Sequence, residues 1–124
     1  MNNNILGRFK KGKGYIKEYD NFNELEFEGE YLNGERNGKG KEYNYDGNIY
    51  FEGEYLDGKK NGIGKEYFDN GELIFEGEYL NGERNGKGKE YDYKGKLYFE
   101  GEYLNGNKII KKINKIKENN NYYF

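Results

Sequence analysis

The sequence predicts an all-β protein, built as a single-layer antiparallel meander of stacked β-hairpin repeats. Three observations support this prediction. The hexapeptide Phe-Glu-Gly-Glu-Tyr-Leu recurs every 24 residues, beginning at Phe27, Phe51, Phe75 and Phe99. Apolar and charged residues alternate within each copy, which is typical of a half-buried strand. Each copy is followed by Asn-Gly or Asp-Gly, and such pairs between extended segments are the strongest short-range signal for a hairpin.

The repeat domain is predicted to span residues 12–106 of the 124-residue chain. It contains three full units with a half unit on each side: full units 27–50, 51–74 and 75–98, and half units 12–26 and 99–106. A single unit of this kind cannot bury its apolar face alone, so stability must come from stacking the units on one another.

Each unit is expected to form two strands. In the first unit, the alternation over 25–32 places Phe27, Gly29 and Tyr31 on one face and the intervening glutamates on the other. After the Asn-Gly turn, a second strand is expected over about 39–45, and an Asp-Gly pair then leads into the next unit. The absence of proline agrees with a continuous ladder of backbone hydrogen bonds.

Equivalent positions of successive units are expected to form rows across the sheet, with aromatic rings supplying the burial. The expected structural rows are Phe27, Phe51, Phe75 and Phe99; Tyr31, Tyr55, Tyr79 and Tyr103; and Gly29, Gly53, Gly77 and Gly101. Tyr19, Tyr43, Tyr67 and Tyr91 are expected to add to these rows from the intervening strands. The glycines are alternatively a surface for close approach of a ligand, but small residues opposite aromatic rows explain them more simply.

The glutamates of the other face form a pair in every unit, beginning with Glu28 and Glu30. We expect a solvated face, because catalysis needs one desolvated carboxylate with a perturbed pKa and not a row of equivalent ones. Binding of a divalent cation, or paired-carboxylate catalysis of the glycosidase type, is the alternative. Lysines such as Lys39 and Lys41 lie on the strands between those that carry the glutamates. The sequence does not show on which face of the sheet these lysines lie.

The two ends of the chain are basic and depart from the repeat. Residues 1–11 form a basic N-terminal segment, 107–117 a basic amphipathic segment, and 118–124 a frayed tail. Within 107–117, isoleucines recur at helical spacing, which predicts a short C-terminal helix. This segment either caps the open end of the sheet or contacts an anionic membrane or a partner protein. The candidate contacts are Lys108, Lys111, Lys112, Lys115 and Lys117.

The composition excludes several classes of function. Only eleven residue types occur, and Ser, Thr, Cys and His are all absent. The chain therefore lacks the usual hydroxyl and thiol nucleophiles and a proton shuttle of near-neutral pKa, so we expect no enzyme, no structural zinc and no cofactor. The body between the basic ends is acidic, so nucleic-acid binding is not expected. Neither a secretory signal nor a membrane span is visible, which favours a cytoplasmic location.

The repeat resembles the MORN (membrane occupation and recognition nexus) repeat. The residues that carry the likeness are Phe51-Glu-Gly-Glu-Tyr-Leu-Asp-Gly-Lys-Lys-Asn-Gly-Ile-Gly64 and their equivalents, over about residues 12–106. The period is 24 where the common unit has about 23, and the tyrosine after Gly-x-Gly lies one residue further on than usual. The segment around Asn70-Gly71 also resembles a bacterial variant found in proteins that neutralise toxins. The resemblance implies a β-hairpin solenoid that contacts proteins or membranes.

The expected function is that of a non-enzymatic scaffold that binds another, unidentified protein. One alternative is peripheral attachment to an anionic membrane surface, on its cytoplasmic side, through the basic ends. A second alternative, implied by the bacterial likeness, is neutralisation of a toxin. The exposed end strands also offer a route to a homodimer, because unpaired strand edges can pair between chains.

Overall fold

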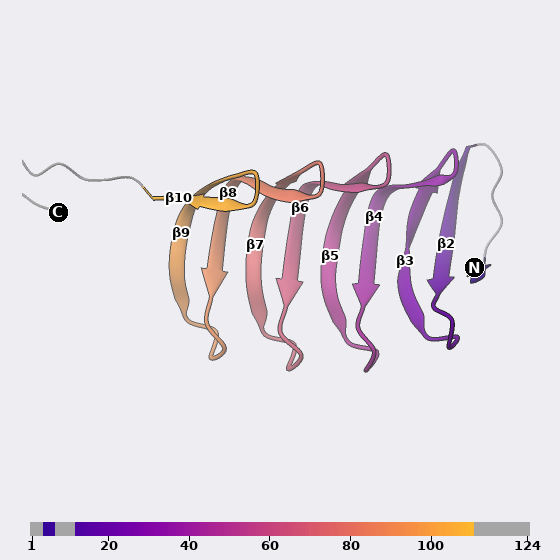
Figure 1. Cartoon of the computed structure of the whole chain (residues 1–124), viewed down its shortest axis with the longest axis horizontal. Coiled ribbons are helices and arrows are strands. Elements are labelled where there is room, and N and C mark those ends of the chain that lie inside the picture. Colours follow the sequence, from indigo (N-terminus) through magenta and orange to yellow (C-terminus); the bar gives the residue numbers. More distant parts are fainter. Residues whose placement is uncertain (1–3, 7–11, 111–124) are drawn as a thin grey trace, which may run out of the picture.

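The structure is a computed structural model that describes residues 4–6 and 12–110 (Figure 1). These residues form one ten-stranded sheet in which every strand pairs antiparallel with its neighbours in the chain. The strands are β1 (Asn4–Leu6), β2 (Lys13–Tyr19), β3 (Leu25–Leu32), β4 (Glu35–Tyr43), β5 (Ile49–Leu56), β6 (Lys59–Tyr67), β7 (Leu73–Leu80), β8 (Glu83–Tyr91), β9 (Leu97–Leu104) and β10 (Asn107–Ile109). All described strands belong to this sheet, so the predicted single-layer meander is confirmed.

The tight turns have the geometry that the Asn-Gly pairs predict. Asn33 and Gly34 both adopt positive φ angles, 49° and 87°, and Asp57 and Gly58 adopt 49° and 87°. Two successive residues with positive φ give a turn whose twist matches that of the flanking strands. The second strand of the unit therefore begins at Glu35, directly after the turn, and the expected start near residue 39 is wrong.

A bulge separates the two halves of each second strand. In β4, Arg36 pairs with Tyr31 and Gly40 pairs with Gly29, so three residues of β4 lie opposite one residue of β3. Gly38 has a φ of 106° inside this bulge. The Glu30 carboxylate accepts a hydrogen bond from the Lys39 backbone N–H at 3.0 Å, which satisfies a donor that the ladder leaves out. The bulge returns in β6 and β8, with Glu54 and Glu78 as acceptors.

The core is one column of aromatic rings along one face of the sheet, the aromatic face. Phe27, Phe51 and Phe75 are fully buried. Each ring packs edge to face against a tyrosine of the next unit: the centroids are 5.4 Å apart for Phe27 and Tyr55, and 5.3 Å apart for Phe51 and Tyr79. Phe75 and Tyr103 repeat the contact at 5.3 Å. Such contacts explain why one unit needs the next.

A row of glycines underlies the aromatic column. Gly29 pairs with Gly40, Gly40 with Gly53, and the row continues to Gly101. A Cβ on Gly40 would lie 2.6 Å from the Phe27 ring, so only glycine leaves room for that ring. The equivalent position of β2 holds Ile16, which is fully buried. No phenylalanine precedes Phe27 by 24 residues, and the Ile16 side chain closes this end of the column instead.

The C-terminal half unit extends further than expected. Strand β10 pairs Asn107 with Leu104 and Ile109 with Glu102, so the segment after Gly106 begins as the second strand of another hairpin. Its first three residues are therefore strand, and the prediction of a helix is wrong for them. Ile110, the next residue, is not helical either. Residues 111–117 lie outside the described residues, as does the predicted tail at 118–124.

Candidate functional site

The aromatic face carries a ladder of alternating charges that the sequence reasoning missed. The pairing of Phe27 with Glu42 places that glutamate on the same face as the phenylalanine. Its equivalents continue the row, and a cation of the neighbouring hairpin stands between each pair of carboxylates. The ladder consists of Glu18, Arg36, Glu42, Lys60, Glu66, Arg84, Glu90 and Lys108.

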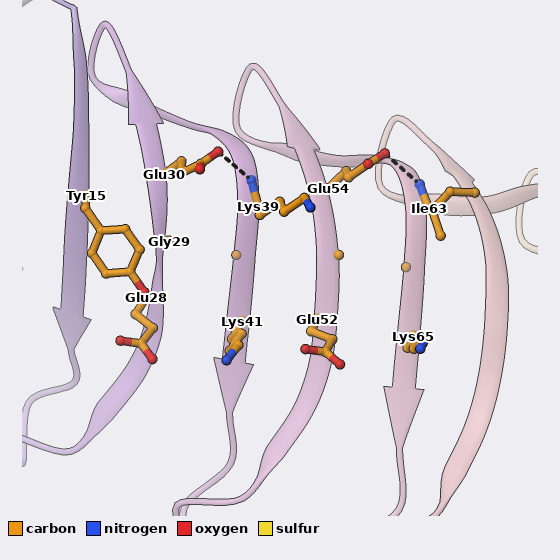
Figure 2. Close-up of a pocket in the computed structure, with 13 residues that line it drawn as sticks. Tyr15, Glu28, Gly29, Glu30, Lys39, Lys41, Glu52, Glu54, Ile63 and Lys65 are labelled. Carbon is orange, nitrogen blue, oxygen red and sulfur yellow. Dashed lines mark hydrogen bonds between the residues drawn. The ribbon is translucent and has the colours of Figure 1, made fainter.

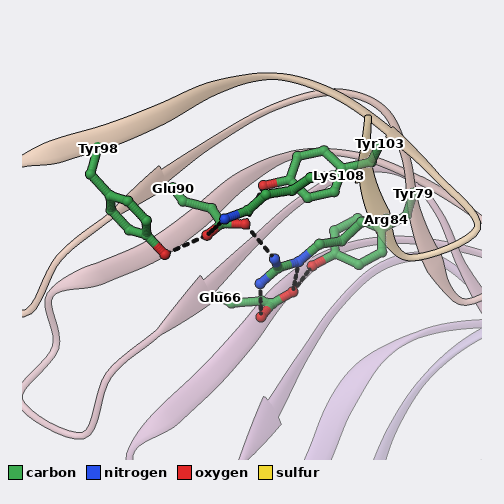
Figure 3. Close-up of polar contacts among 7 residues, drawn as sticks. All are labelled: Glu66, Tyr79, Arg84, Glu90, Tyr98, Tyr103 and Lys108. Atoms are coloured by element: carbon green, nitrogen blue, oxygen red, sulfur yellow. Dashed lines mark hydrogen bonds and ion pairs between the residues drawn. The ribbon is translucent and has the colours of Figure 1, made fainter. Parts of the chain in front are cut away.

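Arg84 links two carboxylates (Figure 3). Its Nη2 lies 2.8 Å from Glu66 Oε1, and its Nη1 lies 3.1 Å from Glu90 Oε2. The guanidinium carbon lies 4.1 Å from the centre of the Phe75 ring, so the cation also covers the aromatic column. Tyr79 donates a hydrogen bond to Glu66, and Tyr103 donates one to Glu90. Both carboxylates therefore have fixed partners.

These contacts and their equivalents lower the pKa of Glu18, Glu66 and Glu90. Burial alone would raise the pKa of Glu66, but hydrogen bonds from Arg84 and Tyr79 and the charge of Arg84 outweigh it. Glu18 follows the same balance with Arg36 and Tyr31. Burial would also raise the pKa of Glu90, but hydrogen bonds from Tyr103, Tyr98 and Lys108 outweigh it. A general acid needs a raised pKa, so these carboxylates are suited to structure and not to proton donation.

The middle unit differs from its neighbours in this ladder. Arg36 holds Glu18 at 3.0 Å and Glu42 at 3.6 Å, as Arg84 holds its own pair. Lys60 stands at the equivalent place, with its Nζ 4.0 Å from the centre of the Phe51 ring. It makes no ion pair with any carboxylate of residues 12–110. A compact ammonium cannot link two carboxylates as a planar guanidinium does.

Lys108 is the last cation of the ladder. Its Nζ lies 3.2 Å from Glu90 Oε1 and 4.8 Å from the centre of the Phe99 ring. Of the five lysines expected to contact a membrane or a partner, this one is held against the sheet itself. Lys111, Lys112, Lys115 and Lys117 lie outside the described residues.

The opposite face, the charged face, carries the repeated glutamate pairs and the lysines between them. Lys41 pairs with Glu28 and Glu52, and Lys39 pairs with Glu54, so these lysines lie on the same face as the glutamates. The expected place of the intervening tyrosines is wrong for three of them, because each follows a glutamate that lies on the aromatic face, and successive residues of a strand point to opposite faces. Their hydroxyl groups donate to glutamates of this face: Tyr43 to Glu28 at 2.7 Å, Tyr67 to Glu52 at 2.5 Å and Tyr91 to Glu76 at 2.6 Å.

A shallow groove crosses the charged face along the row of glycines (Figure 2). One section, of about 360 Å³, extends from Tyr15 to Ile63, and a second, of about 580 Å³, extends onward from Ile63. Charged side chains form both banks, and glycine backbone forms the floor. Ile63 lines both sections, and 54% of its surface is exposed. This groove is the candidate functional site.

One bank of the groove contains a position that changes between nearly identical units. It holds Tyr15, Lys39, Ile63 and Lys87, each 24 residues after the one before. The surrounding Asn-Gly-x-Gly-Lys-Glu-Tyr is otherwise constant in the three full units. This variation within a constant framework was visible in the sequence and would have identified the position.

No metal or membrane-spanning site is found in the described part of the chain. Within 4–6 and 12–110, no group of three or more Asp or Glu residues is arranged to hold a metal ion. No helix among those residues has the length and apolarity needed to cross a bilayer.

Comparison with known proteins identifies the repeat. The family model described as "MORN repeat" matches three successive segments, 27–49, 51–72 and 75–96, which together make up more than half of the chain. A search of curated proteins gave no match. MORN repeats are non-catalytic modules that generally take part in protein–protein or membrane interactions. The matched segments coincide with the hairpin units of the sheet, and the chain belongs to the MORN repeat family.

Proposed function

We propose that this chain is a non-enzymatic scaffold that binds another protein through its charged face. The observation that carries the proposal is the uncovered groove on that face. On the aromatic face, the side chains of the charge ladder cover the column of aromatic rings. On the charged face, no described strand or helix forms a second layer. Exposed surface of this kind, repeated along a solenoid, is how repeat proteins present binding sites.

The chemistry of the chain supports a scaffold and not an enzyme. It lacks Ser, Thr, Cys and His, and the carboxylates with a shifted pKa are all shifted downward. Among residues 12–110 these shifts favour the ionised carboxylate, whereas glycosidase chemistry requires one carboxylic acid that stays protonated near neutral pH.

Membrane attachment through the basic ends is the competing function. The family allows it, and Lys111 to Lys117 could supply the charge. The groove itself is acidic, since eight glutamates and five lysines line it, and Lys108 is already paired with Glu90. A negatively charged face repels an anionic membrane, so protein binding fits this face better. Neutralisation of a toxin would be one case of such binding.

The test is binding by the folded full-length chain. The tagged chain is used to capture proteins from its native source, and each captured protein is purified and titrated back by calorimetry. We expect one partner to saturate at a defined stoichiometry, and no saturation with a Phe51→Asp control whose folding is abolished. Light scattering on the chain alone separates self-association from partner binding. Cosedimentation with anionic vesicles, without any saturating protein partner, would replace this function with the membrane one.

A further inference from the structure

We propose that the groove binds an extended, lysine-rich segment of the partner, with a cationic side chain at every third residue and an apolar side chain seated on Ile63. The proposal rests on the protein-binding function above and specifies its partner.

The charge of the groove selects a cationic partner. In the first and third units the two glutamates are matched by two lysines, Lys39 and Lys41 or Lys87 and Lys89. The middle unit contributes Lys65 alone, because Ile63 takes the place of the second lysine. Glu78 therefore faces Ile63, whereas at the equivalent places Glu54 faces Lys39 and Glu102 faces Lys87. The excess of negative charge within the full units therefore lies beside Ile63. A partner with positive charges on either side of this point would be attracted, and a negatively charged one repelled.

The geometry beside Ile63 defines the spacing of those charges. Glu54 lies on β5 and Glu78 on β7, one strand to either side of Ile63 on β6. Ile63 pairs directly with Glu78, and the Glu54 carboxylate accepts a hydrogen bond from the Ile63 N–H at 3.0 Å. Strands lie about 4.8 Å apart, so these two glutamates repeat at roughly 9.5 Å across the sheet.

That repeat matches one peptide conformation and not another. A polyproline II segment rises about 3.1 Å per residue and has three residues per turn, so every third side chain points the same way at an interval of about 9.3 Å. A β-strand brings every second side chain to one side at about 6.6 Å. Lysines at every third residue therefore stay in register with the glutamates of successive units, and lysines at every second residue do not.

Ile63 supplies an apolar contact where the other full units have lysine. It is 54% exposed in the middle of an otherwise charged face, and it lies between the two sections of the groove. The backbone around it is that of the neighbouring units, since Gly53, Gly64 and Gly77 continue the same row. In a polyproline II segment a residue between two lysines points about 120° away from them. An aliphatic side chain at such a position would contact Ile63 from the side while the lysines approach the glutamates. The repeat fold does not need an isoleucine there, because it tolerates Lys39 and Lys87.

The test uses two synthetic peptides of identical composition, each with four lysines and one central leucine. One has lysine at every third residue and the other at every second residue. Fluorescence anisotropy with the full-length chain should show binding about tenfold tighter for the first peptide, weakening as salt is raised. Equal affinity for the two peptides would overturn the spacing argument.

Two variants with matched precedents in the chain test the anchor. Ile63→Lys recreates the residue of the neighbouring units and should weaken binding of the first peptide about tenfold. Asn48→Lys adds the same charge at an exposed turn, where the third unit already has Lys96, and should leave affinity within about twofold. Unchanged affinity in Ile63→Lys would overturn the role of Ile63. If a natural partner saturates the chain but neither peptide binds, the groove proposal fails and the scaffold function stands.

Discussion

The middle unit and its two neighbours share one backbone, and two of the positions at which they differ lie at the functional surfaces, one on each face of the sheet. On the aromatic face, Lys60 replaces the arginine that links two carboxylates in the other units. On the charged face, Ile63 replaces a lysine. The buried phenylalanines and the turn glycines are the same in all three units. The fold therefore depends on the constant positions, whereas the variable ones adjust local stability and surface chemistry.

The largest expected effect comes from a constant position. Phe51→Ala removes a fully buried ring and should lower the free energy of unfolding by about 3–5 kcal/mol. Phe75→Ala should cost a similar amount, because both rings pack edge to face against a tyrosine of the next unit. Urea denaturation followed by circular dichroism measures both. A cost below about 1 kcal/mol for either would contradict the single aromatic column.

The second effect separates the units. Arg84→Ala leaves Glu66 and Glu90 without their shared cation and should destabilise the fold by about 2 kcal/mol. Lys60→Ala should cost less, about 0.5–1 kcal/mol, since it removes mainly a cation–π contact. Both are measured by urea denaturation at low salt. Equal costs would show that the linking geometry of arginine contributes nothing.

The third effect is a dependence on acid. The pKa values of Glu18, Glu66 and Glu90 are lower in the folded state than in the unfolded chain. Their contribution to stability is therefore complete above the unfolded pKa, about 4.3, and is lost as the pH falls through the folded values. The free energy of unfolding should decline from pH 5 to pH 2. Arg84→Ala removes one cause of the lowered glutamate pKa values, so its free energy of unfolding should fall less steeply with pH. The same slope as in the unchanged protein would show that Arg84 is not such a cause.

The smallest effect tests whether the middle unit can be made like its neighbours. Lys60→Arg should bring a guanidinium between Glu42 and Glu66 and raise the free energy of unfolding by up to about 1 kcal/mol. The reciprocal Arg36→Lys should lower it by a similar amount. Thermal unfolding of the pair provides the measurement, and a loss of stability in Lys60→Arg would mean that the unit has no room for the larger group.

The sequence was sufficient for the strand order, the turns and the family, because each follows from a pattern repeated in register. The charge ladder was not predicted from the sequence. Alternate residues counted from Arg36, just after the turn, nevertheless lead to Glu42, which lies on the same face of the sheet as Tyr31. The bulge at Gly38 does not disturb this parity, since it adds two residues. What could not be derived is which side chains meet across units, such as Tyr55 with Glu42, because this depends on the register in which the last strand of one unit pairs with the first strand of the next.

The strict chain order of the strands has a consequence for how the protein is made. Each strand pairs only with the strands immediately before and after it, so every backbone pairing closes a short loop. Short loop closure favours fast folding. The ribosome releases the N-terminal residues first, so each hairpin emerges after the hairpin on which it packs. The first part to emerge is the end of the aromatic column that Ile16 closes. The sheet can thus lengthen by one hairpin at a time during translation, without waiting for the C-terminal residues.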